Sequence, residues 1–195
     1  MKEIIVASTN AGKIREIKAM LDEIGIEVKS IKDVCEGDVD IEENGTTFKE
    51  NALIKAQTLC NMLNKPTLAD DSGLEVDAMD KAPGIYSARF MGYDTSYDIK
   101  NQAIIDAVEG KDRTARFICA MALCVPGEEP ILIEEAFEGQ IHTHIEGENG
   151  FGYDPIFFVP ELNKTSASLT LEEKNQYSHR AKALKKLYQI LKEKE

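Results

Sequence analysis

A short apolar run that ends in two adjacent acids is the feature that most constrains how this chain can fold. Thr67–Ala69 leads directly into Asp70 and Asp71, and Ser72-Gly73 follows. The apolar run is typical of a buried strand, and Ser-Gly is typical of a turn. A buried Asp without a partner is unfavourable, and two neighbouring carboxylates repel each other unless a cation or a shared proton relieves them. The sequence therefore predicts either a site where a core strand ends or a turn with two solvated acids.

The remaining pattern predicts an α/β fold. Ile4–Ala7 is an apolar run of strand length, and apolar residues then recur at helical spacing over residues 11–24. Thr47–Glu50 is a capping box that starts a second helix, which ends before Pro66. The long apolar run Ala115–Val125 predicts a central strand that is buried on both faces. Shorter runs predict strands over Ile26–Ile31, Ile131–Phe137, Gly139–Ile145 and Ile156–Val159, helices over Ser96–Val108 and from Ser178 onward, and either state over Leu74–Ala78.

Length and charge narrow the class of protein. The 195 residues are enough for one α/β domain or for two small lobes that share a core. No linker, repeat or low-complexity tract divides them, so a single domain over residues 1–195 is expected. The formal net charge of -12 argues against a general nucleic-acid surface, which needs a basic face. In so acidic a chain, an anionic substrate would need local Lys or Arg residues and a divalent cation.

We expect neither a membrane-spanning segment nor secretion. No apolar run reaches the length of a membrane span, and the N-terminus leads directly into a predicted strand, without a signal peptide. The four cysteines have no CxxC spacing, and three of them, Cys60, Cys119 and Cys124, lie in apolar segments. Reduced thiols and a cytoplasmic location are therefore expected.

Basic residues stand in the first turn of two predicted helices. Lys13 follows the candidate N-caps Thr9 and Asn10, and His179 and Arg180 open the C-terminal helix. A cation is mildly unfavourable at the positive end of a helix dipole. A bound anion makes the position favourable for a cation and accepts hydrogen bonds from the free backbone N–H groups. For Lys13 alone a solvated surface lysine is the alternative, and the loop before it is not the phosphate-binding pattern of P-loop ATPases. Two such helix starts together favour an anion site.

Two further groups of polar residues are candidate metal ligands. The acidic stretch Cys35–Gly45 is first interpreted as a solvated loop, but it lies just before a helix and could supply a ligand. His142 and His144 lie at i and i+2 on one face of a predicted strand, so their imidazoles could share a metal. No carboxylate or thiol at ligand spacing completes a tetrahedral set, and an exposed polar face is therefore the favoured interpretation there.

A glycine-rich loop with two aromatic residues adds a candidate base-binding element. Glu148–Pro155 contains Phe151, Tyr153 and Asp154. An aromatic face in this loop can stack on a planar ligand, or the aromatic rings can anchor the loop on the core. Carboxylates bind Mg²⁺, and Mg²⁺ neutralises phosphate oxygens. The acids, the basic helix starts and this loop together point to Mg²⁺-dependent chemistry on a nucleotide polyphosphate.

Six segments, spread in order from near the first residue to near the last, resemble one enzyme family. They are Ser8-Thr9-Asn10-Ala11-Gly12-Lys13, Thr47-Phe48-Lys49-Glu50-Asn51-Ala52, Leu68-Ala69-Asp70-Asp71-Ser72-Gly73, Pro83-Gly84-Ile85-Tyr86-Ser87-Ala88-Arg89, Phe151-Gly152-Tyr153-Asp154-Pro155 and Ser178-His179-Arg180. On these segments the chain resembles the inosine triphosphate pyrophosphatase family, also called Ham1-like proteins. The first segment often reads Thr-Gly-Asn in that family and reads Ser-Thr-Asn here, which keeps Asn10 and Lys13 in place.

The resemblance implies a fold, an activity and an assembly. The implied fold is α/β, elongated and two-lobed, around a long central mixed β-sheet flanked by helices. The implied activity is hydrolysis of ITP, dITP and XTP to the monophosphate and pyrophosphate with Mg²⁺ as cofactor, which keeps deaminated purines out of nucleic acid. The implied assembly is a homodimer.

The resemblance also implies roles for the acids. Asp71 would be the general base and a metal-bound carboxylate, and a water that it deprotonates would attack the α-phosphorus. Glu42 would be the second Mg²⁺ ligand, with Glu43 as the alternative. Asp70 would either contact the metal or shape the loop.

Substrate contacts follow from the same resemblance. Lys13 and Lys174 would contact phosphates, Phe151 would stack on the purine, and His179 and Arg180 would approach its 6-keto edge. A hydrogen-bond donor there pairs with the 6-keto group of inosine or xanthine. Against the amino group of adenine the same donor stays unpaired, which costs about 1–3 kcal/mol of binding free energy. The full set of implied substrate-binding residues is Ser8, Thr9, Asn10, Ala11, Gly12, Lys13, Ser72, Phe151, Gly152, Tyr153, Asp154, Lys174, His179 and Arg180.

Two other functions are compatible with the same residues. A phosphatase with Asp70 or Asp71 as covalent nucleophile would release orthophosphate instead of pyrophosphate. A nucleotide sensor with the same pocket would bind without turnover. The sequence does not rank ITP against XTP, and it contains no visible contact that would exclude GTP.

Overall fold

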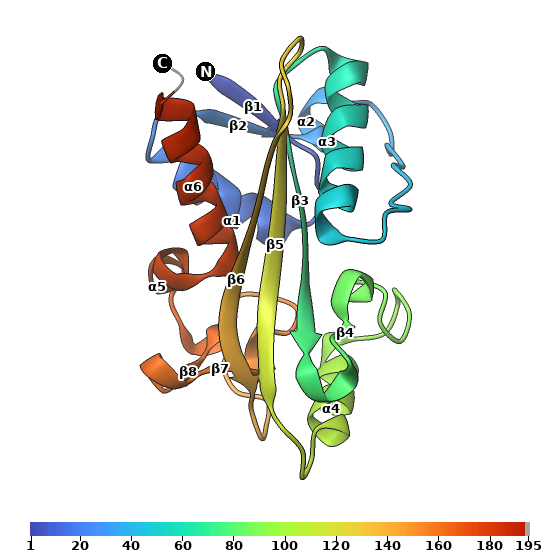
Figure 1. The fold of residues 1–195 in the computed structure, drawn as a ribbon, viewed down its shortest axis with the longest axis vertical. Coiled ribbons are helices and arrows are strands. Elements are labelled where there is room, and N and C mark those ends of the chain that lie inside the picture. Colours follow the sequence, from blue (N-terminus) through green and yellow to red (C-terminus); the bar gives the residue numbers. More distant parts are fainter. Residues whose placement is uncertain (194–195) are drawn as a thin grey trace. The chain divides into compact units, whose positions relative to one another are not determined.

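The computed structural model describes residues 1–193 and contains a mixed β-sheet flanked by helices (Figure 1). Its order is β2-β1-β3-β5-β6-β7-β8, and β4 pairs with β3. The predicted α/β class with a central mixed sheet is therefore confirmed. The strands are β1 (Glu3–Val6), β2 (Glu27–Ser30), β3 (Thr67–Val76), β4 (Ala82–Pro83), β5 (Thr114–Cys124), β6 (Ile131–Ile141), β7 (Phe157–Val159) and β8 (Lys164–Thr165). The helices are α1 (Ala11–Asp22), α2 (Ile31–Val34), α3 (Phe48–Leu63), α4 (Tyr97–Ala107), α5 (Leu171–Tyr177) and α6 (His179–Glu193).

The chain divides into two compact units. Unit 1 consists of Met1–Asp71, Cys119–Glu135 and the chain from Arg180 onward, and unit 2 consists of Ser72–Ile118 and Ala136–His179. The boundaries fall inside β3, β5 and β6, so each of these strands belongs in part to both units. The expected single domain over residues 1–195 stays a prediction.

Unit 1 is built on parallel strands. β1 pairs in parallel with β2 and with β3, with Val6 opposite both Ser30 and Leu68. A continuous apolar strand suits this position, because helices cover both faces of a parallel sheet. In Figure 1, α1 and α6 lie on one side of these strands and α3 on the other. Ile17 and Leu21 of α1 and Leu184 and Leu187 of α6 join Ile4, Val6, Leu68 and Met121 in one buried cluster.

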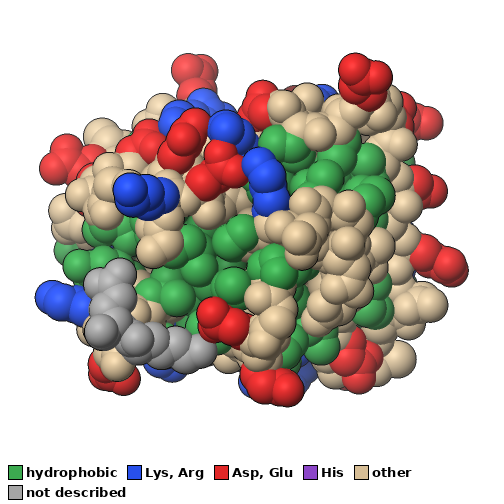
Figure 2. Space-filling view, turned by 90° about the horizontal axis from the view of Figure 1, so that it is seen from above, with side chains coloured by type: hydrophobic (Ala, Val, Ile, Leu, Met, Phe, Trp, Pro, Cys, Tyr) green, Lys and Arg blue, Asp and Glu red, His purple; other side chains and the backbone are tan. Residues whose placement is uncertain are grey.

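Unit 1 also exposes several large apolar side chains. Met1, Met62, Leu132 and Tyr188 are each at least 40% exposed. Figure 2 shows hydrophobic side chains that gather on one face of the molecule, with acidic and basic side chains around them. Contiguous exposed apolar surface of this kind is typical of interaction sites.

Unit 2 has its own core. Ile104, Ile105 and Val108 from the region of α4 pack with Phe117, Phe137, Ile156 and Phe157. The ring of Phe117 lies 4.4 Å from the ring of Phe157, centroid to centroid. β7 pairs antiparallel with both β6 and β8, so this end of the sheet is antiparallel.

The strand that contains the paired acids differs from its prediction. Thr67–Ala69 was expected to end at a Ser-Gly turn, but β3 continues to Val76 and Asp70 and Asp71 lie inside it. A strand tolerates buried acids only where counter-charges reach them. Neighbouring helices supply such groups here, and sequence periodicity does not show them.

Smaller differences concern the ends of elements. β6 ends at Ile141, so His142 and His144 follow the strand and do not lie within it. The short helix α5 was not predicted, although its first turn contains the capping box of Thr170 and Glu173. In the part of the chain that the structure describes, no helix is both long and apolar enough to cross a bilayer.

Candidate active site

The start of α1 is organised by Asn10. Its Oδ1 accepts hydrogen bonds from the backbone N–H groups of Gly12 at 2.9 Å and Lys13 at 3.1 Å, which identifies Asn10 and not Thr9 as the N-cap. The N–H of Asn10 in turn donates to Ser8 Oγ at 3.1 Å. The loop Ser8–Gly12 is therefore a preformed helix start. It places Lys13 in the first turn of the helix.

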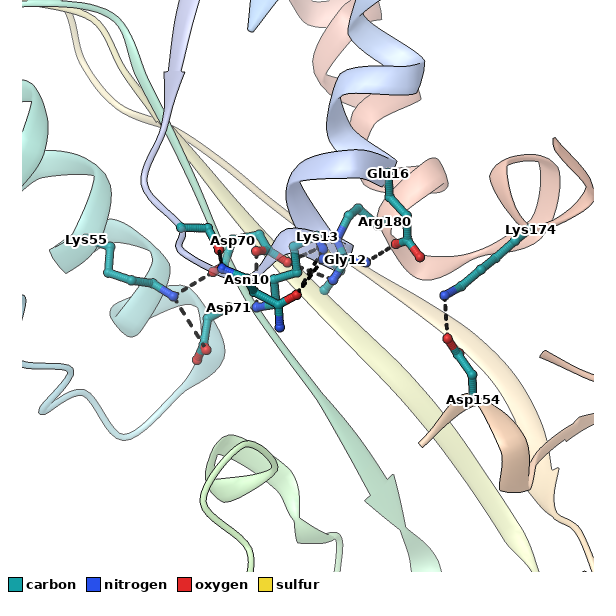
Figure 3. A network of polar contacts seen from close by, with 12 residues as sticks. Asn10, Gly12, Lys13, Glu16, Lys55, Asp70, Asp71, Asp154, Lys174 and Arg180 are labelled. Atoms are coloured by element: carbon teal, nitrogen blue, oxygen red, sulfur yellow. Dashed lines mark hydrogen bonds and ion pairs between the residues drawn. The ribbon is translucent and has the colours of Figure 1, made fainter. Parts of the chain in front are cut away.

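Asp70 is buried between two cations. It is 1% exposed, and its Oδ1 lies 3.2 Å from Lys13 Nζ. Its Oδ2 accepts hydrogen bonds from Arg180 Nη2 at 3.1 Å and Nε at 3.3 Å (Figure 3). The Lys13 side chain is only 17% exposed, so the alternative of a solvated surface lysine is wrong. Asp70 is thus a carboxylate with fixed counter-charges.

Arg180 links Asp70 to a second buried acid. The residue is 2% exposed, and its Nη1 donates to Glu16 of α1. Burial alone would lower the pKa of Arg180, but the nearby carboxylates of Asp70 and Glu16 raise it above the usual range. All three guanidinium nitrogens donate to these two acids. The guanidinium group of Arg180 is therefore fixed by two buried carboxylates.

Asp71 has a different environment from its neighbour. It is 7% exposed, and its Oδ1 lies 3.9 Å from Lys55 Nζ, which is a long ion-pair distance. Its Oδ2 is buried and has no hydrogen-bond partner among the described residues. Burial raises the pKa of Asp71 to about 6, and the attraction of Lys55 and Lys13 limits that rise. A carboxylate with a free, buried oxygen and a pKa near neutrality is suited to proton abstraction.

Lys55 connects Asp71 to the acidic stretch before α3. Its Nζ donates to the backbone oxygen of Asp70 at 2.7 Å and lies 3.3 Å from Glu43 Oε1. Glu42 is exposed and lies outside any helix or strand. Among residues 1–193, these acids do not form a group of three ligand atoms close enough to share an ion. Of the two acids, Glu43 is the one that an ion pair brings into the neighbourhood of Asp71.

In unit 2, the glycine-rich loop is held from inside. Asp154 Oδ2 accepts from the backbone N–H of Phe151 at 2.9 Å and from Lys174 Nζ at 2.7 Å. The Tyr153 hydroxyl donates to the backbone oxygen of Ser87 at 2.6 Å, and Tyr153 is buried. Tyr153 therefore anchors the loop, as one of the two predicted alternatives requires.

Phe151 lies differently from Tyr153. Its ring is only partly buried, and Lys174 Nζ lies 5.0 Å from the ring centroid. One face of the ring thus lies against a cation, as in other cation–π contacts. Gly152, between the two aromatic residues, has a φ of +63°, which favours glycine at the tip of this turn.

The remaining predicted site residues lie in unit 2. His179 is 4% exposed and stacks on Phe117 with 4.9 Å between ring centroids. Ser72 follows Asp71 in β3 and is half-buried.

Two charged residues near Asp70 and Asp71 were not among the predicted site residues. Glu16 follows Lys13 by one turn of α1, and Lys55 lies beside the buried positions Ala52 and Ala56 of α3. Their signal in the sequence is a charged residue at the edge of an apolar helix face. That signal alone does not distinguish a buried charge from a solvated one.

Solved structures with the same architecture define the class. The structure matches that of the Staphylococcus aureus Ham1 protein with a TM-score of 0.88 and 41% sequence identity, over 100% of both chains. A Ham1 protein from Coxiella burnetii matches with a TM-score of 0.88 and 39% identity, over 99% of this chain and 100% of that one. The fold is thus that of Ham1 proteins.

The sequence comparison identifies the family. The model of the Ham1 family matches residues 4–190, and the chain belongs to this family. A relative named dITP/XTP pyrophosphatase from Bacillus licheniformis is 48% identical over 195 residues, which cover 98% of each chain. The resemblance drawn from the six segments is therefore confirmed.

Proposed function

We propose that this chain hydrolyses deaminated purine nucleoside triphosphates, ITP, dITP and XTP, to the monophosphate and pyrophosphate. Membership of the Ham1 family and 48% identity to a dITP/XTP pyrophosphatase support this substrate class. The observation on which the chemistry depends is Asp71, a buried carboxylate with an unpartnered oxygen and a pKa of about 6. A mere binding site has little need for such a group.

We infer that Asp71 acts as the general base. At neutral pH a carboxyl group with this pKa is largely ionised, so it can accept a proton from a water beside it. The water then attacks the α-phosphorus, and pyrophosphate leaves. Lys55 donates to the backbone oxygen of Asp70 and lies 3.9 Å from the other oxygen of Asp71, where its charge would help to keep the base ionised.

Asp71 offers an oxygen ligand to a hard divalent cation such as Mg²⁺. Asp71 Oδ2 is a buried oxygen without a hydrogen bond, and oxygen ligands are those that Mg²⁺ prefers. Asp71 would hold the ion together with Glu42 or Glu43, and the ion pair of Glu43 with Lys55 favours Glu43. When bound, the ion would supply positive charge that stabilises the phosphate oxygens.

Cations of the chain would bind the phosphates. Lys13 is paired with Asp70 at the start of α1, where the helix dipole also favours an anion. A triphosphate offers more negative charge than one carboxylate and would draw Lys13 to itself. We assign the loop Ser8–Gly12, Ser72 and Lys174 to the same task.

Recognition of the base is assigned to residues of the glycine-rich loop and of the start of α6. Phe151 has a ring that is not fully buried and can stack on the purine. His179 and Arg180 would donate to the 6-keto group. Gly152, Tyr153 and Asp154 would shape the loop, because Tyr153 anchors it and Asp154 binds Lys174 and the Phe151 N–H.

The assembly and the compartment are part of the proposal. The exposed apolar side chains of unit 1 and the hydrophobic face in Figure 2 support a homodimer. All four cysteines are free, which fits a reducing compartment such as the cytoplasm. Sedimentation equilibrium over a range of protein concentrations would test the dimer.

Product identity tests the proposed activity. The enzyme would be assayed with Mg²⁺ on dITP, ITP, XTP, GTP and ATP, with pyrophosphate and orthophosphate detected separately. We expect pyrophosphate from the first three and little product from GTP or ATP. Orthophosphate as the first product would instead indicate a phosphatase. Saturable binding of ITP without any product would indicate a sensor.

A further inference from the structure

The segment after β6 assembles three metal-binding side chains that the proposed activity does not use. His142, His144 and Glu146 each place a ligand atom within 4.8 Å of the other two. Residues 1–193 contain no other group of three such side chains this close together. Spacing along the sequence provides the histidine pair with no third ligand. The structure corrects this, because the chain turns after Ile141 and brings Glu146 back to His142.

The local contacts leave ligand atoms facing one another. His142 Nε2 lies 3.1 Å from Glu146 Oε2, yet Nε2 is buried and makes no hydrogen bond among the described residues. The two atoms are therefore close but not aligned as a donor and an acceptor. A cation between a nitrogen lone pair and a carboxylate oxygen would satisfy both atoms.

The orientation of both imidazoles is already supported. The His142 ring stacks on Phe158 at 4.9 Å with an angle of 8° between the planes. His144 Nδ1 lies 3.0 Å from Thr143 Oγ1, and a hydrogen bond at Nδ1 leaves Nε2 available to a metal. Metal-bound histidines commonly use their second nitrogen in this way.

Hydrogen bonds to neighbouring segments fix the backbone of His142 and Glu146. Arg113 Nη1 donates to the backbone oxygen of His142 at 2.9 Å, and the N–H of His142 donates to Ile156 at 2.7 Å. The N–H of Glu146 donates to the backbone oxygen of Pro155 at 2.9 Å, and Thr165 Oγ1 donates to the oxygen of Glu146 at 2.7 Å. The ligands thus project from a fixed frame, which lowers the entropy lost on binding.

We propose that His142, His144 and Glu146 form a binding site for a borderline transition-metal ion, with Zn²⁺ as the favoured occupant. Two imidazoles and one carboxylate are a ligand set that zinc accepts, with a fourth position left for water. Mg²⁺ prefers oxygen ligands only and would not compete well here. Ligand atoms around tetrahedral zinc lie about 3.4 Å apart, from bonds of about 2.1 Å. The His142–Glu146 pair already has such a spacing, and the exposed side chain of His144 can move to reach it.

The test measures zinc binding directly. Untagged full-length protein, stripped with a chelator, is titrated with Zn²⁺ against a chromophoric chelator. A large excess of Mg²⁺ is present to occupy the oxygen ligands of Asp71 and of Glu42 or Glu43. We expect one tight equivalent per chain in the wild type. Co²⁺ in place of Zn²⁺ should give the visible bands of a tetrahedral nitrogen and oxygen site.

Variants assign the ligands. His144→Ala removes an exposed side chain and should weaken Zn²⁺ binding by about 100-fold or more, since loss of an outer partner alone lowers affinity about 10–100-fold. Glu146→Gln should weaken binding at least tenfold, and Thr143→Val about tenfold. Glu148→Gln, two residues away and exposed, is the matched control and should stay within twofold of the wild type.

Several results would overturn the site. These are the absence of a stoichiometric zinc in the wild type, or binding that His144→Ala and Glu146→Gln leave unchanged. A near-ultraviolet charge-transfer band in the Co²⁺ complex would also overturn it, because that band reports thiolate ligands and would transfer the binding to the cysteines.

Discussion

The two groups of polar side chains on which our proposals depend have opposite surroundings. Asp70 and Asp71 lie inside β3, at most 7% exposed, with Lys13 and Lys55 beside them. His144 and Glu146 lie in an exposed turn after β6. Burial raises the proton affinity of an acid and demands counter-charges, whereas exposure leaves a ligand free to bind but contributes little to the fold. The first group is suited to catalysis and the second to metal capture.

The buried group contains a second contrast, between neighbours in one strand. Asp70 has close partners in Lys13 and Arg180, which balance its charge. Asp71 has one distant cation and an oxygen without a hydrogen bond. Alternation along a strand turns adjacent side chains to opposite faces, so two identical residues meet different neighbours.

The largest effect is expected from Asp71→Asn, which removes the base but keeps the shape. We expect the turnover number on dITP to fall by about 10²–10⁴-fold, the usual contribution of general-base catalysis. The melting temperature should stay the same or rise, because an amide does not need to be ionised in a buried place. Steady-state kinetics and a thermal melt measure both. Retention of more than a tenth of the activity would exclude Asp71 as the base.

Arg180→Met tests the counter-charge on the other side of the strand. It leaves Glu16 and Asp70 as buried acids that have lost a partner, and breaking a buried ion pair lowers the free energy of unfolding by about 3–5 kcal/mol. The melting temperature should fall by roughly 6–20 °C for a chain of this size. Arg15→Met, at an exposed position of the same helix as Glu16, is the control and should change stability by less than about 0.5 kcal/mol. Equal stability of the two variants would contradict a structural role for Arg180.

The pH dependence of stability separates Asp71 from an ordinary surface acid. Burial raises the pKa of Asp71 from 3.8 to about 6, so between these values the folded chain holds a proton that the unfolded chain has lost. Its contribution to the free energy of unfolding is therefore present at low pH and is lost as the pH rises through 6. Between pH 4 and pH 6, we expect the free energy of unfolding of the wild type to fall by up to about 3 kcal/mol relative to that of Asp71→Asn. Above pH 6 the difference should stay constant.

Chemical denaturation of both proteins at several pH values, without divalent ions, measures this difference. A difference that does not change with pH would contradict a raised pKa. Activity should show the complementary trend and fall about tenfold per pH unit below the pKa, since the base must be ionised.

The smallest effect is expected at the exposed histidine cluster. Zn²⁺ at ten times its dissociation constant should stabilise the wild type by about 1.4 kcal/mol, because only the folded chain assembles the three ligands. This corresponds to a rise of roughly 3–6 °C in melting temperature. The rise should be absent in His144→Ala and retained in Glu148→Gln. An equal rise in all three proteins would indicate binding elsewhere.

Local patterns predicted much of this architecture. The apolar runs at β1 and β5 and the spacing in α1, α3 and α4 are each visible without tertiary information, and their bounds differ by only a few residues. The caps Asn10 and Thr47 were also recognisable, because a cap and its helix are neighbours in the chain. The helix α5 was missed, since its seven residues contain almost no apolar periodicity.

The sequence by itself determined most of the elements, the family and the list of polar residues that stand out from them. Only the tertiary structure decided which of these charges are partners. Arg180 meets Asp70 across 110 positions of the chain, and no periodicity records such a contact. It also decided that Glu146 joins His142 and His144, because a turn after β6 replaced the straight strand that alternation predicted. Periodicity reports which side of an element faces the core, whereas the protonation and the partners of a side chain depend on the groups that folding brings around it.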